Sequence, residues 1–131
     1  MAKYRKYITK GILESLHKVP GHSKAPIRRT LMLGKSQIPE SKIHLAVHEV
    51  NATRKKIPPY TTLHSHNVDE IDLIIPQGGK LVYQIQLEDE TYKITAPCTV
   101  FIPKKLRHKA NVVSGKGIFV CMIMSNKYKT F

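Results

Sequence analysis

The chain is 131 residues long, which suits a single domain, and 41% of its residues are hydrophobic, which excludes wholesale disorder. No stretch approaches the ~18 consecutive apolar residues of a membrane helix, so we expect no membrane contact. The N-terminus is basic but lacks a continuous apolar segment and a cleavage pattern, so we expect no signal peptide and a cytoplasmic protein.

Basic residues are in large excess, with 22 Lys and Arg against 9 Asp and Glu and a formal net charge of +13. This excess favours anionic partners, from carboxylated or phosphorylated metabolites to nucleic acid. Aromatic residues make up only 7% and form no cluster with basic ones, so we do not expect nucleic-acid binding. Lys104, Lys105 and Arg107 form one weak cluster, which is either ordinary surface charge or a contact for an anionic substrate.

The first part of the chain, residues 1–41, is broken into short pieces by Pro20-Gly21, Pro26 and Gly34. We interpret it as an N-terminal extension that packs on the domain formed by residues 42–131, in its own chain or in a second copy. From residue 42 onward, apolar and polar side chains alternate in short runs, as expected for β-strands. The predicted strands span residues 42–51, 60–66, 69–76, 80–87, 91–95, 98–103, 107–113 and 118–126.

Turn residues separate these runs, most clearly at 76–79 (Pro-Gln-Gly-Gly) and at 115–117 (Gly-Lys-Gly). Many short antiparallel strands at this spacing predict an all-β sandwich or barrel. A jelly roll would fold them into two facing sheets.

A cluster of possible metal ligands lies among these strands. His64 and His66 are separated by one residue, so their side chains point to the same face of a strand. Glu70 follows after a spacer that lets the next strand direct its carboxylate to the same space, and His108 comes after Pro103 on a separate strand. Three imidazoles and one carboxylate are a natural ligand set for a divalent transition metal. Taken alone, a histidine pair such as His64/His66 is more often a surface or structural feature of a strand than a set of metal ligands.

These residues resemble the two motifs of the cupins, a superfamily of small jelly-roll barrels. The first motif, G-x5-H-x-H-x3-4-E-x6-G, is matched at both histidines and the glutamate by PPYTTLHSHNVDEIDLIIPQGG. The second, G-x5-P-x-G-x2-H-x3-N, is matched at the proline and the histidine by PCTVFIPKKLRHKAN. Pro58, Pro97 and Lys105 stand where motif glycines are expected, and those glycines serve turns rather than ligation.

The resemblance implies a cupin-type double-stranded β-helix, a jelly-roll barrel, over residues 42–131, with residues 1–41 as an extension packing on it. It implies one divalent transition metal held by His64, His66, Glu70 and His108, with Fe, Mn, Ni and Zn all open as its identity. It also implies frequent dimerisation. We therefore expect a small-molecule ligand or substrate in the barrel, and a homodimer.

Two further residues are candidates for a catalytic role. Tyr83 and Gln84 lie on opposite faces of the run 80–87, and alternation does not decide which face lines the cavity. An inward Tyr83 could donate a proton near the metal, whereas an inward Gln84 could bind substrate. On the preceding run, alternation from Glu70 directs Asp72 to the same side, where it could hydrogen-bond to a ligand imidazole.

Two functions remain open on these residues. In the first, the chain is a metal-dependent enzyme, of dioxygenase or isomerase/lyase type, that acts on a small anionic metabolite. In the second, it is a non-catalytic barrel that binds or senses a metal or a small molecule. The sequence has no obvious dedicated acid/base pair, so in the enzyme the metal would carry most of the chemistry. Fold class alone does not decide between the two.

Overall fold

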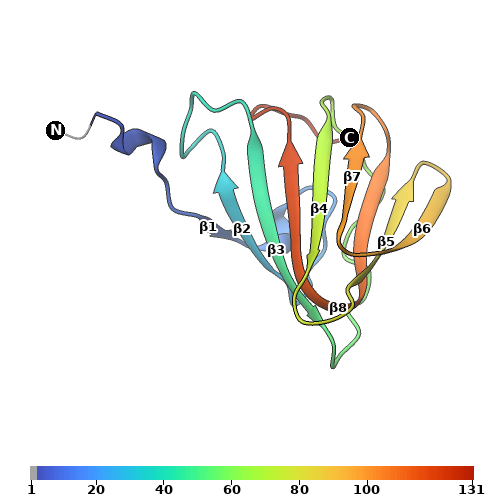
Figure 1. Cartoon of the computed structure of the whole chain (residues 1–131). Coiled ribbons are helices and arrows are strands. Elements are labelled where there is room, and N and C mark those ends of the chain that lie inside the picture. Colours follow the sequence, from blue (N-terminus) through green and yellow to red (C-terminus); the bar gives the residue numbers. More distant parts are fainter. Residues whose placement is uncertain (1–2) are drawn as a thin grey trace.

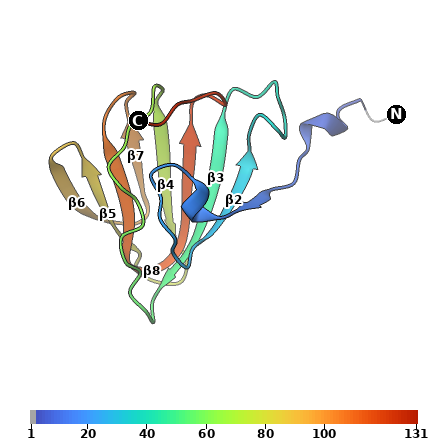
Figure 2. The same cartoon turned by 180° about the vertical axis from the view of Figure 1, so that it is seen from behind.

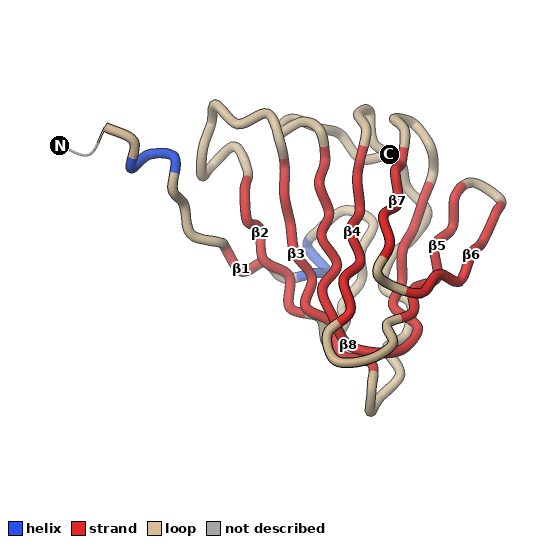
Figure 3. Tube along the Cα trace, viewed as in Figure 1, coloured by secondary structure: helices blue, strands red, loops and turns tan. Residues whose placement is uncertain are grey.

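Antiparallel strands are the main secondary structure of the computed structural model, which describes residues 3–131 (Figure 1, Figure 3). Two short 3-10 helices, η1 (Arg5–Tyr7) and η2 (Leu16–Lys18), lie in the N-terminal part. The strands are β1 (Ile12–Glu14), β2 (Arg28–Leu33), β3 (His44–Ala52), β4 (Glu70–Pro76), β5 (Val82–Leu87), β6 (Glu90–Thr95), β7 (Cys98–Ile102) and β8 (His108–Ile123). No helix in the described part of the chain has the length and apolar character needed to cross a membrane.

Strand β8 is shared by two groups of paired strands. Its C-terminal part pairs with β3 and β4 in a sheet of order β1-β2-β3-β8-β4-β7. Its N-terminal part pairs with β5, which in turn pairs with β6. Figure 1 shows β8 curving from one group into the other, so that both face a common interior. The prediction of an all-β jelly roll is confirmed.

The predicted turn at residues 115–117 is wrong, because these residues lie inside β8. Their pairing with β3 is uninterrupted and begins with Gly115 opposite Ala52. Gly115 instead lets the backbone of β8 pass close to the backbone of residues 80 and 81. A Cβ at Gly115 would clash with the carbonyl oxygen of Lys80, and its φ of +98° is one that other residues rarely adopt.

The segment 60–66, predicted as a strand, forms isolated bridges rather than a continuous ladder. These bridges join His22 to Thr61, His64 to His108 and His66 to Thr130. The N–H groups of Tyr60 and Thr61 donate to the side-chain oxygen of Asn111, at 2.8 and 3.0 Å, so a side chain takes the place of a neighbouring strand. The segment is still held extended along β8, and this places its histidines over the interior.

The N-terminal residues extend the larger sheet and cover its inner face. β2 pairs with β3 and β1 pairs with β2, so both strands continue that sheet at its edge. Between them, η2 and the loop after it cross the inner face, as Figure 2 shows. Leu16 and Ile27 of this connection are buried in the core of the barrel. Residues 3–11 instead run outward from the edge of the sheet (Figure 1).

The interior is divided along the strands into an apolar half and a polar half. The inward residues of β4 are Glu70, Asp72 and Ile74, in that order, and all three are buried. Ile74 belongs to an apolar core that includes Leu81 and Tyr83, both fully buried. Buried polar side chains occupy the other half, among them His48, His64, His66, Glu70, Asp72 and His108. Burying polar groups is costly unless they are paired, so this half is where a functional site is expected.

We predict that Gly115→Ala lowers the free energy of unfolding by on the order of 3 kcal/mol, since the added Cβ meets backbone in a left-handed conformation. Gly78→Ala is the matched control, because Gly78 also has a positive φ, +70°, but a Cβ there would have no heavy atom within 4 Å. Its expected loss is only about 1 kcal/mol. Urea unfolding measures both, and equal losses would contradict the close crossing at β8.

Candidate metal centre

Three histidine side chains converge in the polar half of the interior. His64 and His66 come from the extended segment before β4, and His108 is the first residue of β8. One ring nitrogen of each lies within 4.8 Å of the others, and the residues are at most 8% exposed. Two nitrogens bound to one ion at ~2.0–2.1 Å lie at most about 4 Å apart, so a small closing movement would bring all three into ligand range. The His64/His66/His108 group could therefore hold a metal ion.

Backbone carbonyls orient two of these imidazoles. Nδ1 of His64 lies 2.6 Å from the carbonyl oxygen of Thr62, and Nδ1 of His108 lies 2.9 Å from that of Leu106. A carbonyl oxygen only accepts, so Nδ1 carries the proton in both rings. Nε2 then keeps its lone pair available to an ion, which is the arrangement that metal-binding histidines require.

The C-terminal residues orient the third imidazole. Phe131 exchanges two backbone hydrogen bonds with Ser65, at 2.8 and 3.1 Å, and so fixes the end of the chain beside the site. The hydroxyl of Thr130 then lies 3.1 Å from Nδ1 of His66, and the ring of Tyr128 lies 5.1 Å from the His66 ring, centroid to centroid. Nε2 of His66 is therefore also left facing the common space. Neither Thr130 nor Tyr128 is marked by a sequence motif.

Glu70 lies beside the histidines, at the start of β4. Its Oε1 is 3.2 Å from Nε2 of His66 and 3.3 Å from Nε2 of His108. Oε1 of Glu70 and Nε2 of His108 are fully buried, yet neither makes a hydrogen bond within residues 3–131. Unpaired buried polar atoms are costly, and a cation between a carboxylate oxygen and an imidazole lone pair would satisfy both. The residues present therefore fit a metal ion.

The charge states of these groups follow from burial and from one another. Burial lowers the pKa of His64 to about 4, so this imidazole is neutral, the form that binds metal. Burial also acts to lower the pKa of His108, but the neighbouring Glu70 carboxylate outweighs burial and raises that pKa. Burial acts to raise the pKa of Glu70, but His108, His66 and Asp72 outweigh it and hold that pKa well below its usual range. Glu70 is thus ionised at neutral pH.

Asp72 is fully enclosed behind Glu70. Burial, followed by the negative charge of Glu70, raises the pKa of Asp72 well above its usual range, so it is a neutral carboxylic acid. Burial likewise raises the pKa of the Cys121 thiol, which lies with both carboxyl groups in a cluster whose ligand atoms are within 4.8 Å of one another. The expected contact between Asp72 and a ligand imidazole is not made, because two carbonyls and a threonine hydroxyl occupy the outer ring nitrogens.

The two catalytic candidates of the run 80–87 lie away from the histidines. Tyr83 points inward, but it is buried in the apolar half, where its ring stacks on Phe119 with centroids 5.2 Å apart. Gln84 is exposed on the outer face of β5. Neither side chain lines the pocket that contains the three histidines.

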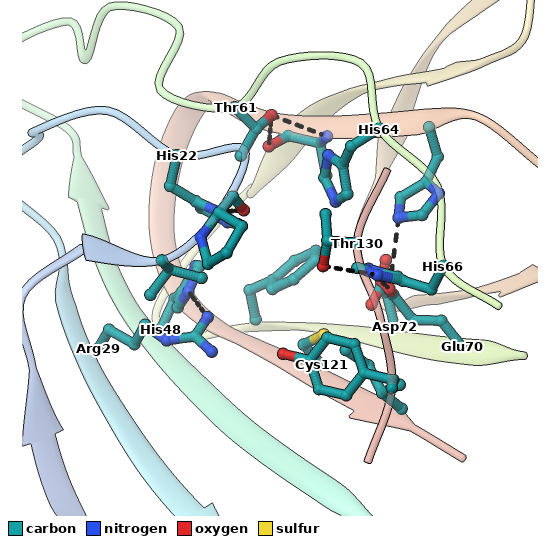
Figure 4. A pocket seen from close by; sticks show the side chains of 17 residues that line it. His22, Arg29, His48, Thr61, His64, His66, Glu70, Asp72, Cys121 and Thr130 are labelled. Atoms are coloured by element: carbon teal, nitrogen blue, oxygen red, sulfur yellow. Dashed lines mark hydrogen bonds and ion pairs between the residues drawn. The ribbon is translucent and has the colours of Figure 1, made fainter. Parts of the chain in front are cut away.

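One pocket joins the histidines to groups that no sequence motif connected with them. It encloses about 540 Å³ including its open mouth, and Figure 4 shows the side chains that line it. Besides the histidines and Glu70, its walls include His22, Arg29, His48, Tyr128 and Thr130. These residues come from the N-terminal part, from β3 and from the C-terminus, and only the folded chain brings them together. A small molecule in this pocket would touch both the candidate metal ligands and these groups.

Comparisons with protein-family models and with curated proteins found no match for this chain. Solved structures do match its fold. KdgF from Halomonas sp. has a TM-score of 0.57 and 13% identity over 87% of both chains. A cupin 2 domain-containing protein from Halorhodospira halophila has a TM-score of 0.60 and 18% identity, over 79% of this chain and 66% of that one.

A third similar structure is the polyketide cyclase RemF from Streptomyces resistomycificus. It has a TM-score of 0.58 and 16% identity, over 94% of this chain and 78% of that one. The chain therefore has the cupin fold, which confirms the fold that the two motifs implied.

We predict that His48 makes the stability of the metal-free protein depend on pH. Burial, and then the charge of Arg29, lowers the pKa of His48 to about 3, whereas an unfolded histidine titrates near ~6.5. Between these values the unfolded chain binds a proton that the folded chain does not, so stability falls as the pH falls through this window.

His48→Gln keeps an acceptor for Arg29 but removes this titration. The free energy of unfolding of the variant should depend less steeply on pH, by up to about 1 kcal/mol per pH unit. Urea unfolding from about pH 4.5 to about pH 7 measures the difference between the two profiles. Parallel profiles for wild type and variant would contradict the assignment to His48.

Proposed function

We propose that the chain is a metal-dependent enzyme that holds one divalent transition metal in the His64/His66/His108 group and acts on a small molecule in the barrel. The observation that carries this proposal is the orientation of the three imidazoles. Each Nδ1 has its own hydrogen-bonding partner, so each Nε2 is left for the same space. We assign Glu70 as the fourth ligand, because its Oε1 lies within 3.3 Å of Nε2 of both His66 and His108.

The bound ion would supply Lewis acidity toward a substrate oxygen, or oxygen chemistry if it is iron. The chain itself would orient the substrate and move protons. His22 is placed for proton transfer, because its ring lies 6.0 Å from that of His64, centroid to centroid. Its Nδ1 is 3.0 Å from the carbonyl of Pro20, and its Nε2 makes no hydrogen bond among the described residues. That nitrogen can take a proton from, or return one to, a molecule in the pocket.

The choice of metal among Fe, Mn, Ni and Zn bears on the reaction type. Imidazole suits all four, so the ligand set alone does not select one. Iron would favour a dioxygenase, whereas manganese, nickel or zinc would favour an isomerase or lyase. The polyketide cyclase among the similar structures supports a catalytic use of this fold, but it carries no substrate over to this chain.

We predict about one metal ion per chain in untagged protein, lost in the double variant His64→Ala/His66→Ala and reduced in His108→Ala, since each substitution removes a ligand nitrogen. His17→Ala is the matched control, because His17 is exposed and outside the site. Elemental analysis after reconstitution and dialysis measures the ratio. A metal content that His108→Ala and His17→Ala leave equally unchanged would refute the site.

The alternative function, a non-catalytic barrel that binds or senses a small molecule, uses the same pocket and differs in turnover. An enzyme converts added carboxylate metabolites when loaded with metal and loses this activity on His108→Ala. A sensor binds them stoichiometrically and returns them unchanged. Mass spectrometry of the small-molecule fraction separates the two, and stoichiometric binding without product would replace the enzyme with the sensor.

We also propose that two copies of the chain associate through the N-terminal arm, residues 3–14. The arm carries large exposed apolar side chains, with Tyr4, Ile8 and Leu13 at least 64% exposed. Within residues 3–131, β1 pairs only with β2 and its other edge is unpaired, and Figure 2 shows the arm extending beyond the sheet. A free strand edge next to apolar side chains is suited to pairing with the same edge of a second copy.

We predict a dimer by light scattering coupled to size exclusion, and a monomer for Leu13→Asp, because the added charge cannot be buried between the two arms. Phe101→Asp is the control, since Phe101 is 57% exposed on β7, at the opposite edge of the sheet. A dimer that survives Leu13→Asp but not Phe101→Asp would move the interface to β7. A wild-type monomer at all concentrations would overturn the proposal.

A further inference from the structure

A buried arginine lies on one wall of the pocket, opposite the candidate metal ligands. Arg29 belongs to β2, and its side chain is only 5% exposed. It lines the same pocket as the three histidines. Figure 4 shows Arg29 and His48 on one side of this pocket, with His66 and Glu70 on the other. An arginine in such a place is unusual, because burying a charge is costly unless it is paired.

The guanidinium of Arg29 is only partly paired by the protein. Its Nε donates to Oε1 of Glu14 at 2.9 Å, and its Nη1 donates to Nε2 of His48 at 3.0 Å. Its Nη2 has no hydrogen-bond partner within residues 3–131. Glu14 is 31% exposed, so water screens its charge, whereas the arginine is enclosed. Donor capacity and positive charge are therefore left over inside the pocket.

His48 fixes the direction of this guanidinium without adding a charge. An arginine nitrogen can only donate, so Nε2 of His48 accepts and the imidazole is neutral. Burial and the charge of Arg29 keep it neutral by lowering its pKa. Arg29 is thus held from two sides, by Glu14 and by His48. A guanidinium fixed in this way loses little freedom when it binds a carboxylate.

We propose that Arg29 binds a carboxylate group of the ligand, so that the substrates of this pocket are small carboxylic acids with a second oxygen function that reaches the metal centre. Only the contact between the second oxygen and the metal rests on the proposed function, whereas the contact between the carboxylate and Arg29 does not. The guanidinium supplies parallel N–H donors that match the two oxygens of a carboxylate.

The distances along the pocket wall fit a short ligand. His22 lies between the two ends, with its ring 5.9 Å from that of His48 and 6.0 Å from that of His64, centroid to centroid. A chain of a few carbon atoms spans such a wall. The carboxylate would lie at Arg29, the other oxygen at the histidines, and the carbon atoms between them beside His22, the proton-transferring group of the proposed reaction.

Charge supports an anionic ligand at this wall. Arg29 carries a permanent positive charge inside the protein, and its carboxylate partner, Glu14, is partly exposed to water. The surface cluster at residues 104–107 does not serve this purpose, since none of its side chains lines the pocket and Arg107 pairs with Glu88 at 2.9 Å on the surface.

The test is isothermal titration calorimetry of the metal-loaded chain with malonate, succinate, glutarate and adipate, which differ by one methylene each. The neutral diamides of the same acids are the matched ligands without charge. We expect one length to bind best and its diamide to bind at least about 10-fold more weakly. Arg29→Gln should weaken the best acid about 10- to 100-fold while leaving the metal content unchanged.

Glu14→Gln is the control that separates binding from structure. It removes the charge of the ion pair but keeps a side-chain oxygen that can accept from Nε of Arg29, so the guanidinium stays held. An arginine with a purely structural role would make both variants lose stability and neither lose affinity. Ligand recognition by Arg29 predicts that Glu14→Gln binds the acid as tightly as wild type or more tightly. If Arg29→Gln does not fold, Arg29→Lys replaces it, and a lysine without the bidentate fork should still weaken binding.

The outcomes distinguish this inference from the proposed function. If the chain takes up no metal but binds an acid in a way that depends on Arg29, the carboxylate site is supported and the proposed metal-dependent enzyme is refuted. Metal binding with acid affinity unchanged in Arg29→Gln, or in Arg29→Lys where that variant is needed, would keep the metal centre and overturn the carboxylate site. The absence of Arg29-dependent binding for all four acids would overturn it as well.

Discussion

The site depends on the course of one strand. β8 is 16 residues long, and it begins at His108 and ends at Ile123. Its first residue bridges to His64, while its last residue pairs with Glu70. The two ends of the strand would lie far apart if it were straight, yet His108 and Glu70 come within 3.3 Å of each other. The strand must therefore curl around the interior, and Gly115 lies within it at a close crossing with the backbone of Lys80.

This curvature gathers buried polar groups around one pocket. One ring nitrogen of each of the three histidines has a carbonyl or a hydroxyl partner, and the other makes no hydrogen bond among residues 3–131. Such an interior is less stable than a fully paired one, because unsatisfied polar atoms have lost their water. An ion that binds the folded chain and not the unfolded chain stabilises the fold in proportion to its affinity. Folding and the binding of an ion at this candidate site would therefore be linked through the same few atoms.

Local chemistry in the sequence predicted the centre of the site but not its surroundings. His64, His66, Glu70 and His108 could be singled out because strand alternation and motif spacing act over short distances, and the structure brings these four together. Arg29 lies 35 residues before His64 in the sequence, and Thr130 lies 64 residues after His66. No local pattern links such distant segments. Only pairing of β2 with β3, and of the C-terminus with residue 65, brings them in.

The errors in the strand assignment have the same origin. Gly-Lys-Gly at 115–117 has the composition of a turn, but the chain needs glycine there for close approach between strands. Residues 60–66 alternate like a strand, but the side chain of Asn111 takes up hydrogen bonds that a neighbouring strand would otherwise make. In both places tertiary packing decides how a local preference is used.

The two walls of the pocket come from different parts of the chain. The metal-side groups lie on the segment before β4, on β4 and on β8, within the two motifs. The opposite wall consists of Arg29 and His22, which precede the first motif, and of His48 on β3, while Thr130 and Tyr128 follow the second. Most of the wall opposite the motif residues therefore comes from segments outside the two motifs. Recognition of the ligand would then depend on those outer segments. Two barrels with the same metal ligands would select different molecules if different side chains of β2 lay opposite the metal.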